Sequence, residues 1–459
     1  MPLFLFNTLT RNKDEFQPLH PPEVGLYTCG PTVYDYQHVG NYRTYVFEDV
    51  LRRSLRLFGF KVRHVMNITD VGHLTSDADE GEDKMEVGGA REGKSARDIA
   101  KLYTEAFLED CRELNLLPPD VLCKATDHIP EQIELISRLE AKGLVYRTSD
   151  GLYYDTARFP GYSRLVGEDH VRGIEEGARV GANPEKKAAT DFAVWKFSPK
   201  DKKRHMEWAS PWGSGFPGWH IECSAMAMKY LGETFDIHCG GVDHIPIHHT
   251  NEIAQAEGAT SKPFVRWWMH AEFLVMNSAK MAKSAGGFVT LADLKARGFD
   301  PLDYRYHCLT AHYRKQLDFT WEALEASKTS RRRLREASLG LQEEKSAPAR
   351  ADFDRAFRDS LADDLNAPAA LASVWDMLRS AMPSGMKRCF LEQAEQILAL
   401  GLFKEEATEL SPDAERLLSA RARARAEKDY ALSDKLRADL DAMGIIVEDT
   451  KQGQKWRKK

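Results

Sequence analysis

The chain has 459 residues, of which 42% are hydrophobic, and a formal net charge of −6. This is the composition of an ordinary folded protein with about three domains. The negative charge argues against a general polyanion-binding protein, although it leaves room for local basic patches. The seven cysteines are an odd number and widely scattered, which favours free or metal-bound thiols in a reducing compartment over a disulfide framework.

Membrane insertion and secretion are not expected. No apolar run approaches the ~20 residues that a membrane-spanning helix needs. The N-terminal segment before Thr10 is short and lacks the basic flank of a signal peptide. We therefore expect a cytoplasmic protein.

The first informative stretch runs from a buried strand into a helix. The pattern predicts a strand over Val24–Thr28, a stop at Gly30 and Pro31, and a helix that begins near Asn41. A strand that feeds a helix N-terminus through a glycine-bearing loop is a phosphate site in many α/β folds, because free N–H groups and the helix dipole favour an anion.

Four residues of this stretch carry chemistry. Cys29 follows the strand directly, and His38 and Asn41 flank the helix start, with Gly40 between them to allow close approach. A lone cysteine is usually a small buried hydrophobe, and a lone histidine before a helix is usually a cap. The stretch is therefore a candidate catalytic site, and the rest of the chain must decide between the catalytic and the structural interpretation.

The next elements predict an α/β domain built on a parallel sheet. A second strand is expected over 61–67, followed by Thr69 at its carboxyl edge. Ligands bind outside the carboxyl ends of such strands, so Cys29 and Thr69 are expected there. The acidic segment 76–86 is expected to be a solvated loop, and 96–114 an amphipathic helix.

An inserted subdomain is expected between about residues 125 and 208. A helix over 131–142 and short strands over 144–147 and 152–155 precede a polar, glycine-rich stretch over 166–187. A helix over 220–231, a strand over 235–239 and a helix over 246–257 then resume the alternation. Asp243 follows Gly240-Gly241 at the end of that strand. One Rossmann-like sheet split by an insertion explains this order.

The remainder of the chain is dominated by helical periodicity. Helices are expected over 323–342, 352–361, 367–379, 387–400, 412–425 and 430–443, and a short strand over 445–448. The Glu405-Glu406 pair and Ser411-Pro412 mark a boundary before the last region.

Four candidate metal ligands are spread along the chain. Cys29 and Cys223 supply thiols, and His248 and Glu252 are four residues apart, so one helix face presents both. These are zinc-type ligands, but their spacing is not that of a zinc finger. His244 and His249 are rival ligands, and His249 would point about 100° away from His248 on a regular helix. The residues alone leave the zinc site open.

The segment Met276-Asn-Ser-Ala-Lys280-Met-Ala-Lys283-Ser284 places two lysines in a loop of small residues. Such a loop is either an exposed turn, since lysine is mostly a solvated residue, or a flexible clamp of two ammonium groups on a polyphosphate.

Taken together, these segments resemble class I aminoacyl-tRNA synthetases. His38-Val-Gly-Asn41 is similar to their His-Ile-Gly-His signature, and Lys280-Met-Ala-Lys-Ser284 to their Lys-Met-Ser-Lys-Ser loop. The segments 27–35, 218–226 and 248–252 resemble the cysteinyl-tRNA synthetase family in particular, and the likeness extends over essentially the whole chain. The chain departs from the family pattern at Asn41, Thr250 and Ala282, where the family has His, Glu and Ser.

The resemblance implies a two-step reaction. Cysteine and ATP give cysteinyl-adenylate and pyrophosphate, and the cysteinyl group is then transferred to the 3′ end of tRNA(Cys). His38 and Asn41, beside Gly40, would donate to phosphate oxygens, while Lys280 and Lys283 would cover the β- and γ-phosphates with Mg²⁺. Asp243 would hold the ATP ribose or the amine of the amino acid.

The same resemblance implies one Zn²⁺ per chain, held by Cys29, Cys223, His248 and Glu252. Thiolate is a far better zinc ligand than a hydroxyl, so the metal would separate cysteine from serine without an editing domain. Thr32, Thr69, Trp219 and His238 would form the walls of the substrate pocket, beside Cys29.

The expected domains follow from the segments and the resemblance. They are a first half of the catalytic domain (1–124), an inserted connective subdomain (125–208), a second half with the zinc site and lysine loop (209–285), a stem-contact linker (286–322), a helical bundle (323–404) and an anticodon-binding region (405–459).

The last region would bind the anticodon. Residues 451–459 carry five basic side chains, no acidic one and Trp456. Basic residues neutralise phosphate and an aromatic ring can stack on an unpaired base. Arg421, Arg423 and Arg425 are expected on a solvated helix face that also touches RNA, and the chain is expected to be a monomer.

Two other interpretations remain open from the sequence. The ligases that join cysteine to an amino-sugar in mycothiol synthesis resemble the same catalytic core, but lack the full anticodon-binding end. A catalytically inactive paralogue that binds RNA is the second. The presence of residues 411–459 argues against the first, and intact Cys29, His38, Lys280 and Lys283 argue against the second.

Overall fold

The computed structural model describes residues 1–72, 83–168, 183–199, 204, 206–276, 279–280, 288–342, 351–404, 411–450 and 453–458. These residues form two compact units, 1–402 and 403–459. No helix among them is long and apolar enough to cross a bilayer.

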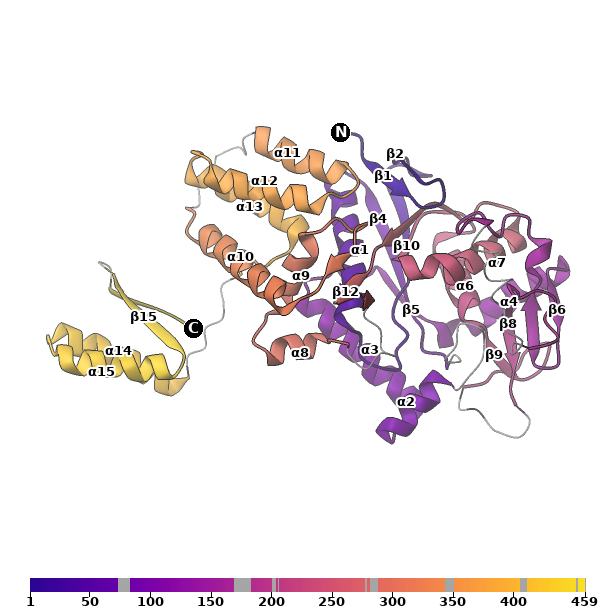
Figure 1. Ribbon diagram of the computed structural model, residues 1–459, viewed down its shortest axis with the longest axis horizontal. Coiled ribbons are helices and arrows are strands. Elements are labelled where there is room, and N and C mark those ends of the chain that lie inside the picture. Colours follow the sequence, from indigo (N-terminus) through magenta and orange to yellow (C-terminus); the bar gives the residue numbers. More distant parts are fainter. Residues whose placement is uncertain are drawn as a thin grey trace. The chain divides into compact units, whose positions relative to one another are not determined.

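A five-stranded parallel sheet lies at the centre of the first unit (Figure 1). Its strands, in spatial order, are β11 (Val265–Ala271), β10 (Phe235–Gly241), β3 (Glu23–Thr28), β4 (Lys61–Ile68) and β5 (Val121–Lys124). From β3 the chain moves outward to β4 and β5, whereas β10 and β11 are added on the other side. This reversal opens a crevice at the carboxyl ends of β3 and β10. The prediction of an α/β fold with a parallel sheet is confirmed.

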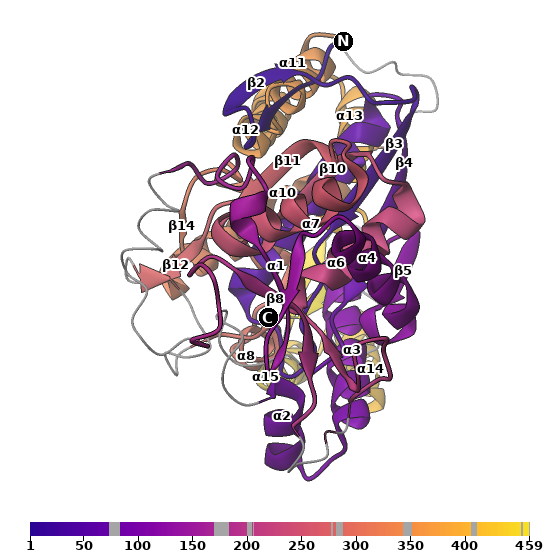
Figure 2. The same cartoon turned by 90° about the vertical axis from the view of Figure 1, so that its right-hand side faces the viewer.

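Helices cover both faces of this sheet, as the two views of the molecule show (Figures 1 and 2). The helix α1 (Val39–Leu57) buries Val46, Val50 and Leu51 at helical spacing, and α3 (Ala96–Glu113) starts at Ser95, whose side chain accepts a hydrogen bond from the Asp98 N–H. A hairpin of β1 (Phe4–Asn7) and β2 (Asn12–Glu15) precedes the sheet.

The insertion between β5 and β10 carries its own antiparallel sheet. The strands are β6 (Val145–Arg147), β7 (Gly151–Tyr154), β8 (Phe192–Phe197) and β9 (Gly215–Pro217). The helix α4 (Ile129–Ala141) packs against α6 (Trp219–Leu231) and α7 (Thr250–Thr260). The insertion therefore supports the two helices that carry Cys223 and Glu252.

The acidic segment 76–86 is not entirely a loop. Asp83 accepts hydrogen bonds from the N–H groups of Met85 and Glu86 and so starts the helix α2 (Lys84–Glu92). Asp83 is also buried against the Arg204 guanidinium. A carboxylate at a helix N-terminus is favourable, which explains why an acidic sequence begins a helix here. The part of the segment before Asp83 lies outside the described residues.

The rest of the first unit is mainly helical. It contains β12 (Leu274–Met276), β13 (Ala279–Lys280) and β14 (Leu317–Asp318) in one small sheet, then α8 (Leu291–Ala296), α9 (Pro301–Leu309), α10 (Trp321–Leu339), α11 (Ala351–Ala362), α12 (Ala367–Arg379) and α13 (Ser384–Leu398). Helices were expected in each of the last four places, and the observed ends differ by a few residues.

The second unit packs two helices against a β-hairpin. Its elements are α14 (Pro412–Ala426), α15 (Tyr430–Ala442), β15 (Ile445–Thr450) and β16 (Gly453–Lys458). The basic C-terminal segment is thus a strand as far as it is described, and Trp456 packs against a small core that includes Leu418, Leu440 and Val447.

Arg421 corrects the expectation of a solvated arginine face on α14. Its side chain is fully buried and donates to both carboxylate oxygens of Asp449, at 3.0 and 2.8 Å. Arg423 and Arg425 are exposed. The helical period alone could not separate them, because the partner Asp449 lies on a strand that comes later in the sequence.

A buried arginine ties the sheet domain to the helical region of the first unit. Arg305 on α9 is fully buried and donates to Asp49 on α1 at 2.6 Å, to the Leu398 carbonyl oxygen at 2.6 Å and to the Leu114 carbonyl oxygen at 3.1 Å. Asp49 is also paired with Arg53, and these two cations overcome the effect of burial and lower the pKa of its carboxyl.

We expect Arg305→Leu to lower the free energy of unfolding of the first unit by about 3–5 kcal/mol, because it leaves buried acceptors without their donor. Chemical denaturation followed by circular dichroism measures the change. Arg332→Leu is the matched control, since the Arg332 side chain is 61% exposed and lies 3.9 Å from Glu336. Equal losses in both variants would contradict this role for Arg305.

Candidate active site

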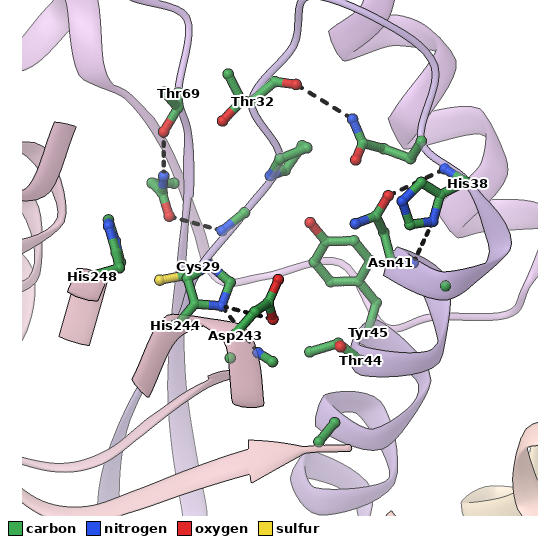
Figure 3. Close-up of a pocket in the computed structure, with 18 of the residues that line it drawn as sticks. Cys29, Thr32, His38, Asn41, Thr44, Tyr45, Thr69, Asp243, His244 and His248 are labelled. Atoms are coloured by element: carbon green, nitrogen blue, oxygen red, sulfur yellow. Dashed lines mark hydrogen bonds and ion pairs between the residues drawn. The ribbon is translucent and has the colours of Figure 1, made fainter. Parts of the chain in front are cut away.

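A pocket of about 420 Å³ lies at the carboxyl ends of β3, β4 and β10 (Figure 3). Ten of the residues that the sequence predicts for the site line it. They are Cys29, Thr32, His38, Gly40, Asn41, Thr69, Trp219, Cys223, Asp243 and His248. The pocket therefore joins residues that are up to about two hundred positions apart in the sequence.

One side of the pocket is the N-terminus of α1. His38 is the N-cap residue: the Asn41 N–H donates to His38 Nδ1 at 3.2 Å, and the His38 N–H donates to Asn41 Oδ1 at 3.2 Å (Figure 3). Because Nδ1 accepts, a neutral His38 ring carries its proton on Nε2. A Cβ on Gly40 would lie 2.9 Å from His38 Nδ1, so glycine is required for this cap.

The loop before α1 is fixed by side chains of the neighbouring strand. The Gly30 N–H donates to Asn67 Oδ1 at 2.8 Å, and Asn67 Nδ2 donates to the Thr69 hydroxyl at 3.0 Å. A Cβ at Gly30 would lie only 1.7 Å from the Asn67 carbonyl oxygen. Thr32 forms a parallel bridge with Thr69. The sequence analysis missed Asn67, although it lies only two residues before the predicted edge residue Thr69.

The opposite side of the pocket holds the predicted metal ligands. One ligand atom from each of Cys29, Cys223, His248 and Glu252 lies within 4.8 Å of the others, and all four residues are buried. A second buried group, Cys29, His238, His249 and Glu252, meets the same criterion. Two thiols, an imidazole and a carboxylate in this volume fit a tetrahedral zinc site.

The segment that carries the histidines is not a regular α-helix. Residues Ile245–His249 form a π-helical turn, and α7 starts at Thr250. His248 Nε2 lies 2.9 Å from Glu252 Oε1, while His249 Nε2 lies 3.4 Å from Cys29 Sγ. Both histidines therefore approach the cluster, which corrects the expectation that His249 points away. π-Turns inside helices are frequent at functional sites.

The buried charges of the cluster stabilise one another. Burial opposes the charge on Glu252, but His238 and His248 lower the pKa of its carboxyl to about 2. Burial lowers the pKa of His248, but Glu252 and Cys223 together raise it to about 10. A hydrogen bond from the Cys29 thiol lowers the pKa of Cys223 to about 6, so Cys223 is the thiol that ionises first.

His238 lies behind the cluster rather than in the pocket wall. Its Nε2 is 2.9 Å from Glu252 Oε2, and the residue is fully buried. The resemblance implied that it is a wall residue, but its side chain instead holds the carboxylate of Glu252. Orientation of a ligating carboxylate by a hydrogen bond is typical of metal sites.

Two further histidines complete this layer, and the sequence analysis assigned a role to neither. His220 Nδ1 lies 2.9 Å from His248 Nδ1, and His270 Nε2 lies 2.7 Å from His249 Nδ1. His270 is paired in register with Gly240 on the neighbouring strand. A strand predicted beside β10 would have brought His270 to the site, but the sequence did not single out that strand.

The remaining predicted site residues occupy separate parts of the pocket. The Trp219 ring lies 4.6 Å from the His248 ring, centroid to centroid. Asp243 follows β10, and its carboxylate lies 3.8 Å from His244 Nδ1 (Figure 3). For Lys280 only the backbone in β13 is described, and Lys283 lies outside the described residues.

Comparison with known proteins supplies two family matches. Residues 15–329 match the family described as "tRNA synthetases class I (C) catalytic domain". Residues 407–457 match the "Cysteinyl-tRNA ligase anticodon binding domain". The two matches lie in the two units of the structure, and the first covers more than half of the chain.

Curated relatives align with nearly the whole chain. The chain is 53% identical over 458 residues to "Cysteine--tRNA ligase 1" of Burkholderia lata, covering 99% of this chain and 97% of the relative. It is 44% identical over 493 residues to "Cysteine--tRNA ligase" of Treponema denticola, with 100% of both chains covered.

A solved structure with low sequence identity shows that the fold itself is shared. The methionyl-tRNA synthetase of Mycobacterium tuberculosis, bound by methionyl-adenylate, aligns with a TM-score of 0.55 at 15% identity and covers 90% of this chain and 96% of its own. The family matches and the full-length relatives decide the assignment. The chain belongs to the cysteine–tRNA ligase family of class I tRNA synthetases.

Proposed function

We propose that this chain activates L-cysteine with ATP, releases pyrophosphate, and transfers the cysteinyl group to the 3′ end of tRNA(Cys). The observation that carries the proposal is that one pocket contains both a buried two-thiol metal cluster and a capped helix N-terminus. The first suits a thiol substrate and the second suits the phosphates of ATP.

Cysteine recognition is assigned to the cluster. The donor set of Cys29, Cys223, His248 and Glu252 fits Zn²⁺, with His238 and His220 holding the carboxylate and the imidazole in place. A zinc ion bound there supplies a soft Lewis acid that favours a substrate thiolate over a hydroxyl. The second cluster, with His238 and His249 in place of Cys223 and His248, carries one thiol instead of two and is therefore the weaker zinc site.

Adenylate formation is assigned to the other side of the pocket. The Nε2–H of His38 donates to phosphate oxygens, which the positive end of the α1 dipole also attracts, and Asn41 holds His38 in its cap position. Gly40 lets the phosphates approach the backbone. Lys280 and Lys283 neutralise the β- and γ-phosphates together with Mg²⁺.

The walls between the two sides position the substrates. Asp243 is proposed to bind the ATP ribose or the ammonium of cysteine, and Thr32, Thr69 and Trp219 to shape the volume beside Cys29. His238 is proposed to act indirectly, through Glu252, rather than to touch the substrate.

We further propose a division of labour along the chain. Residues 1–124 and 209–285 form the catalytic domain, 125–208 the connective insertion, 286–322 a stem-contact linker, 323–404 a helical bundle and 405–459 the anticodon-binding region. The match of 407–457 to an anticodon-binding family supports the last assignment and argues against a cysteine–amino-sugar ligase. Seven free cysteines suit the cytoplasm, where we propose that the chain acts as a monomer.

The purified protein is expected to carry about one zinc per chain. Cys223→Ser is expected to lose metal and cysteine affinity together, because a hydroxyl is a poor zinc ligand. Metal analysis and equilibrium binding of cysteine measure the two effects. Cys308→Ser, which changes a buried cysteine on α9, is the control. Full metal retention in Cys29→Ser, Cys223→Ser and His248→Ala alike would contradict the proposed ligands.

Lys283→Ala is expected to slow adenylate formation by on the order of 10²-fold or more, because a cation on the departing pyrophosphate is lost. Cysteine affinity should change little. Single-turnover kinetics measure the rate, and Lys295→Ala, which removes an exposed lysine paired with Glu113, is the matched control. An unchanged rate in Lys283→Ala would remove the lysine loop from the phosphate site.

Deletion of residues 405–459 is expected to leave cysteine-dependent ATP–pyrophosphate exchange nearly intact, because the first unit ends at Leu402 and contains the whole pocket. Charging of tRNA at limiting RNA concentration should fall sharply, and tRNA binding should depend less steeply on salt, because phosphate contacts are lost. Loss of exchange in a truncated protein with native circular dichroism would refute the division of labour. Unimpaired charging would favour the amino-sugar ligase, and absence of exchange in the full chain would refute the proposed function itself.

A further inference from the structure

A second cavity, of about 220 Å³, lies between α1, β4, α3 and the segment that follows α3. Most of its wall is apolar and includes Phe107, Leu108 and Leu116. Charged and polar side chains interrupt this wall: Asp49 and Arg112 are two of them, and the other three are Glu48 and Arg52 from α1 and His64 from β4. The proposed reaction uses none of these three side chains.

Several polar atoms at this cavity lack a hydrogen-bond partner. Glu48 is 2% exposed, and apart from the Thr28 hydroxyl its carboxyl oxygens have no hydrogen-bond partner among the described residues. Arg52 Nε and His64 Nδ1 have none there either. A buried carboxyl group with so few partners favours a ligand that pairs with it.

The nearby charges are already balanced, with the exception of Glu48. Arg52 is paired with Asp120 at 2.9 Å, Asp49 with Arg305 at 2.6 Å, and Arg112 with Glu109. Burial, and then the neighbouring Arg52, lowers the pKa of His64 to about 3, so its ring is neutral. No side-chain cation pairs with Glu48 in the part of the chain that the structure describes, so a ligand that carries a cation can pair with this carboxyl group when it ionises.

The size of the cavity limits the ligand. An apolar protein cavity of about 150 Å³ binds benzene, and the volume here is about 220 Å³, which leaves room for a ring with a short side chain. We propose that this cavity is a binding site for a small arylalkylamine, whose ring packs against Phe107 and Leu108 and whose ammonium group pairs with the Glu48 carboxylate.

The proton balance of binding follows from the burial of Glu48. Burial raises the pKa of the Glu48 carboxyl well above its ordinary value, which favours the protonated acid in the empty cavity. An ammonium that enters as a cation pairs with a carboxylate, and the carboxyl proton goes to the solvent. Binding therefore releases about one proton per amine near neutral pH.

The cavity is distinct from the active-site pocket but shares a wall with it. Tyr45 on α1 lines both. His64 Nε2 is bonded to the Thr28 hydroxyl at 2.9 Å, and Thr28 directly precedes Cys29. A ligand in the second cavity thus contacts the elements that form the active site without occupying the place of cysteine.

Calorimetric titration of the full chain with phenethylamine tests the proposal, in the presence of saturating L-cysteine so that the active-site pocket is occupied. Glu48→Gln should weaken binding by at least about tenfold, because a charge-assisted pair is lost. It should also abolish the proton release, measured in two buffers of different ionisation enthalpy. The control Glu109→Gln, at an exposed carboxylate on α3, should change neither quantity.

Two further measurements separate the ring from the amine. 2-Phenylethanol, which has the same ring and no charge, should bind wild type and Glu48→Gln with similar affinity. Leu108→Trp fills the cavity and should abolish binding of both probes while cysteine-dependent pyrophosphate exchange persists. Equal phenethylamine affinity in wild type and Glu48→Gln, binding that survives Leu108→Trp, or no binding at millimolar amine would each overturn the proposal.

Discussion

The parallel pairing of β3 with β10 is the constraint on which the site depends. It aligns Leu26 with Ile237 and Thr28 with Cys239. The two strands are more than two hundred residues apart in the sequence, with the whole insertion between them. Since both strands end at the same edge, Cys29 lies beside the turn that leads into the histidine segment. A shift of this register by one residue would turn every side chain of β10 to the opposite face and remove His238 from Glu252.

Burial explains why the cluster needs so many histidines. Glu252 and the two thiols are removed from water, where an unpaired charge is very costly. His248 Nε2 and His238 Nε2 each lie 2.9 Å from one oxygen of Glu252, and His220 Nδ1 lies 2.9 Å from His248 Nδ1. The carboxylate is therefore ionised and oriented before any substrate arrives. The free energy needed to bring these groups together is therefore supplied by folding and not by substrate binding.

The sequence was sufficient for features that depend on local pattern. Helical periodicity and the strand–loop–helix order predicted the parallel sheet, α1, and the helices of the first unit after β14 with small errors at their ends. The ligand types of Cys29, Cys223, His248 and Glu252 also followed from residue chemistry, and the structure brings them together. Local pattern is informative here because each of these segments is amphipathic or bounded by glycine and proline.

Features that depend on contacts between distant parts of the chain could not be predicted from local sequence pattern. The π-turn at Ile245–His249 turns His249 toward Cys29, whereas a regular helix would point it about 100° away from His248. Arg421 has the spacing of an exposed arginine, yet it is buried because Asp449 meets it from a strand. The helix at Lys84 starts inside an acidic run because Asp83 caps it while Arg204, more than a hundred residues away, neutralises it.

The active-site pocket and the second cavity both lie along α1. They differ in whether their buried polar groups have partners within the protein. At the active site, Asn41 and His38 satisfy each other, and Glu252 has a histidine on each oxygen. Two turns along the same helix, Glu48 is equally buried and has no such partner among the described residues. Both carboxyl groups lie in low-dielectric surroundings, but only Glu252 is paired with histidines, so its pKa falls while that of Glu48 rises. Burial alone thus does not decide the charge of a carboxyl group in this fold; the residues that the sheet brings beside it do.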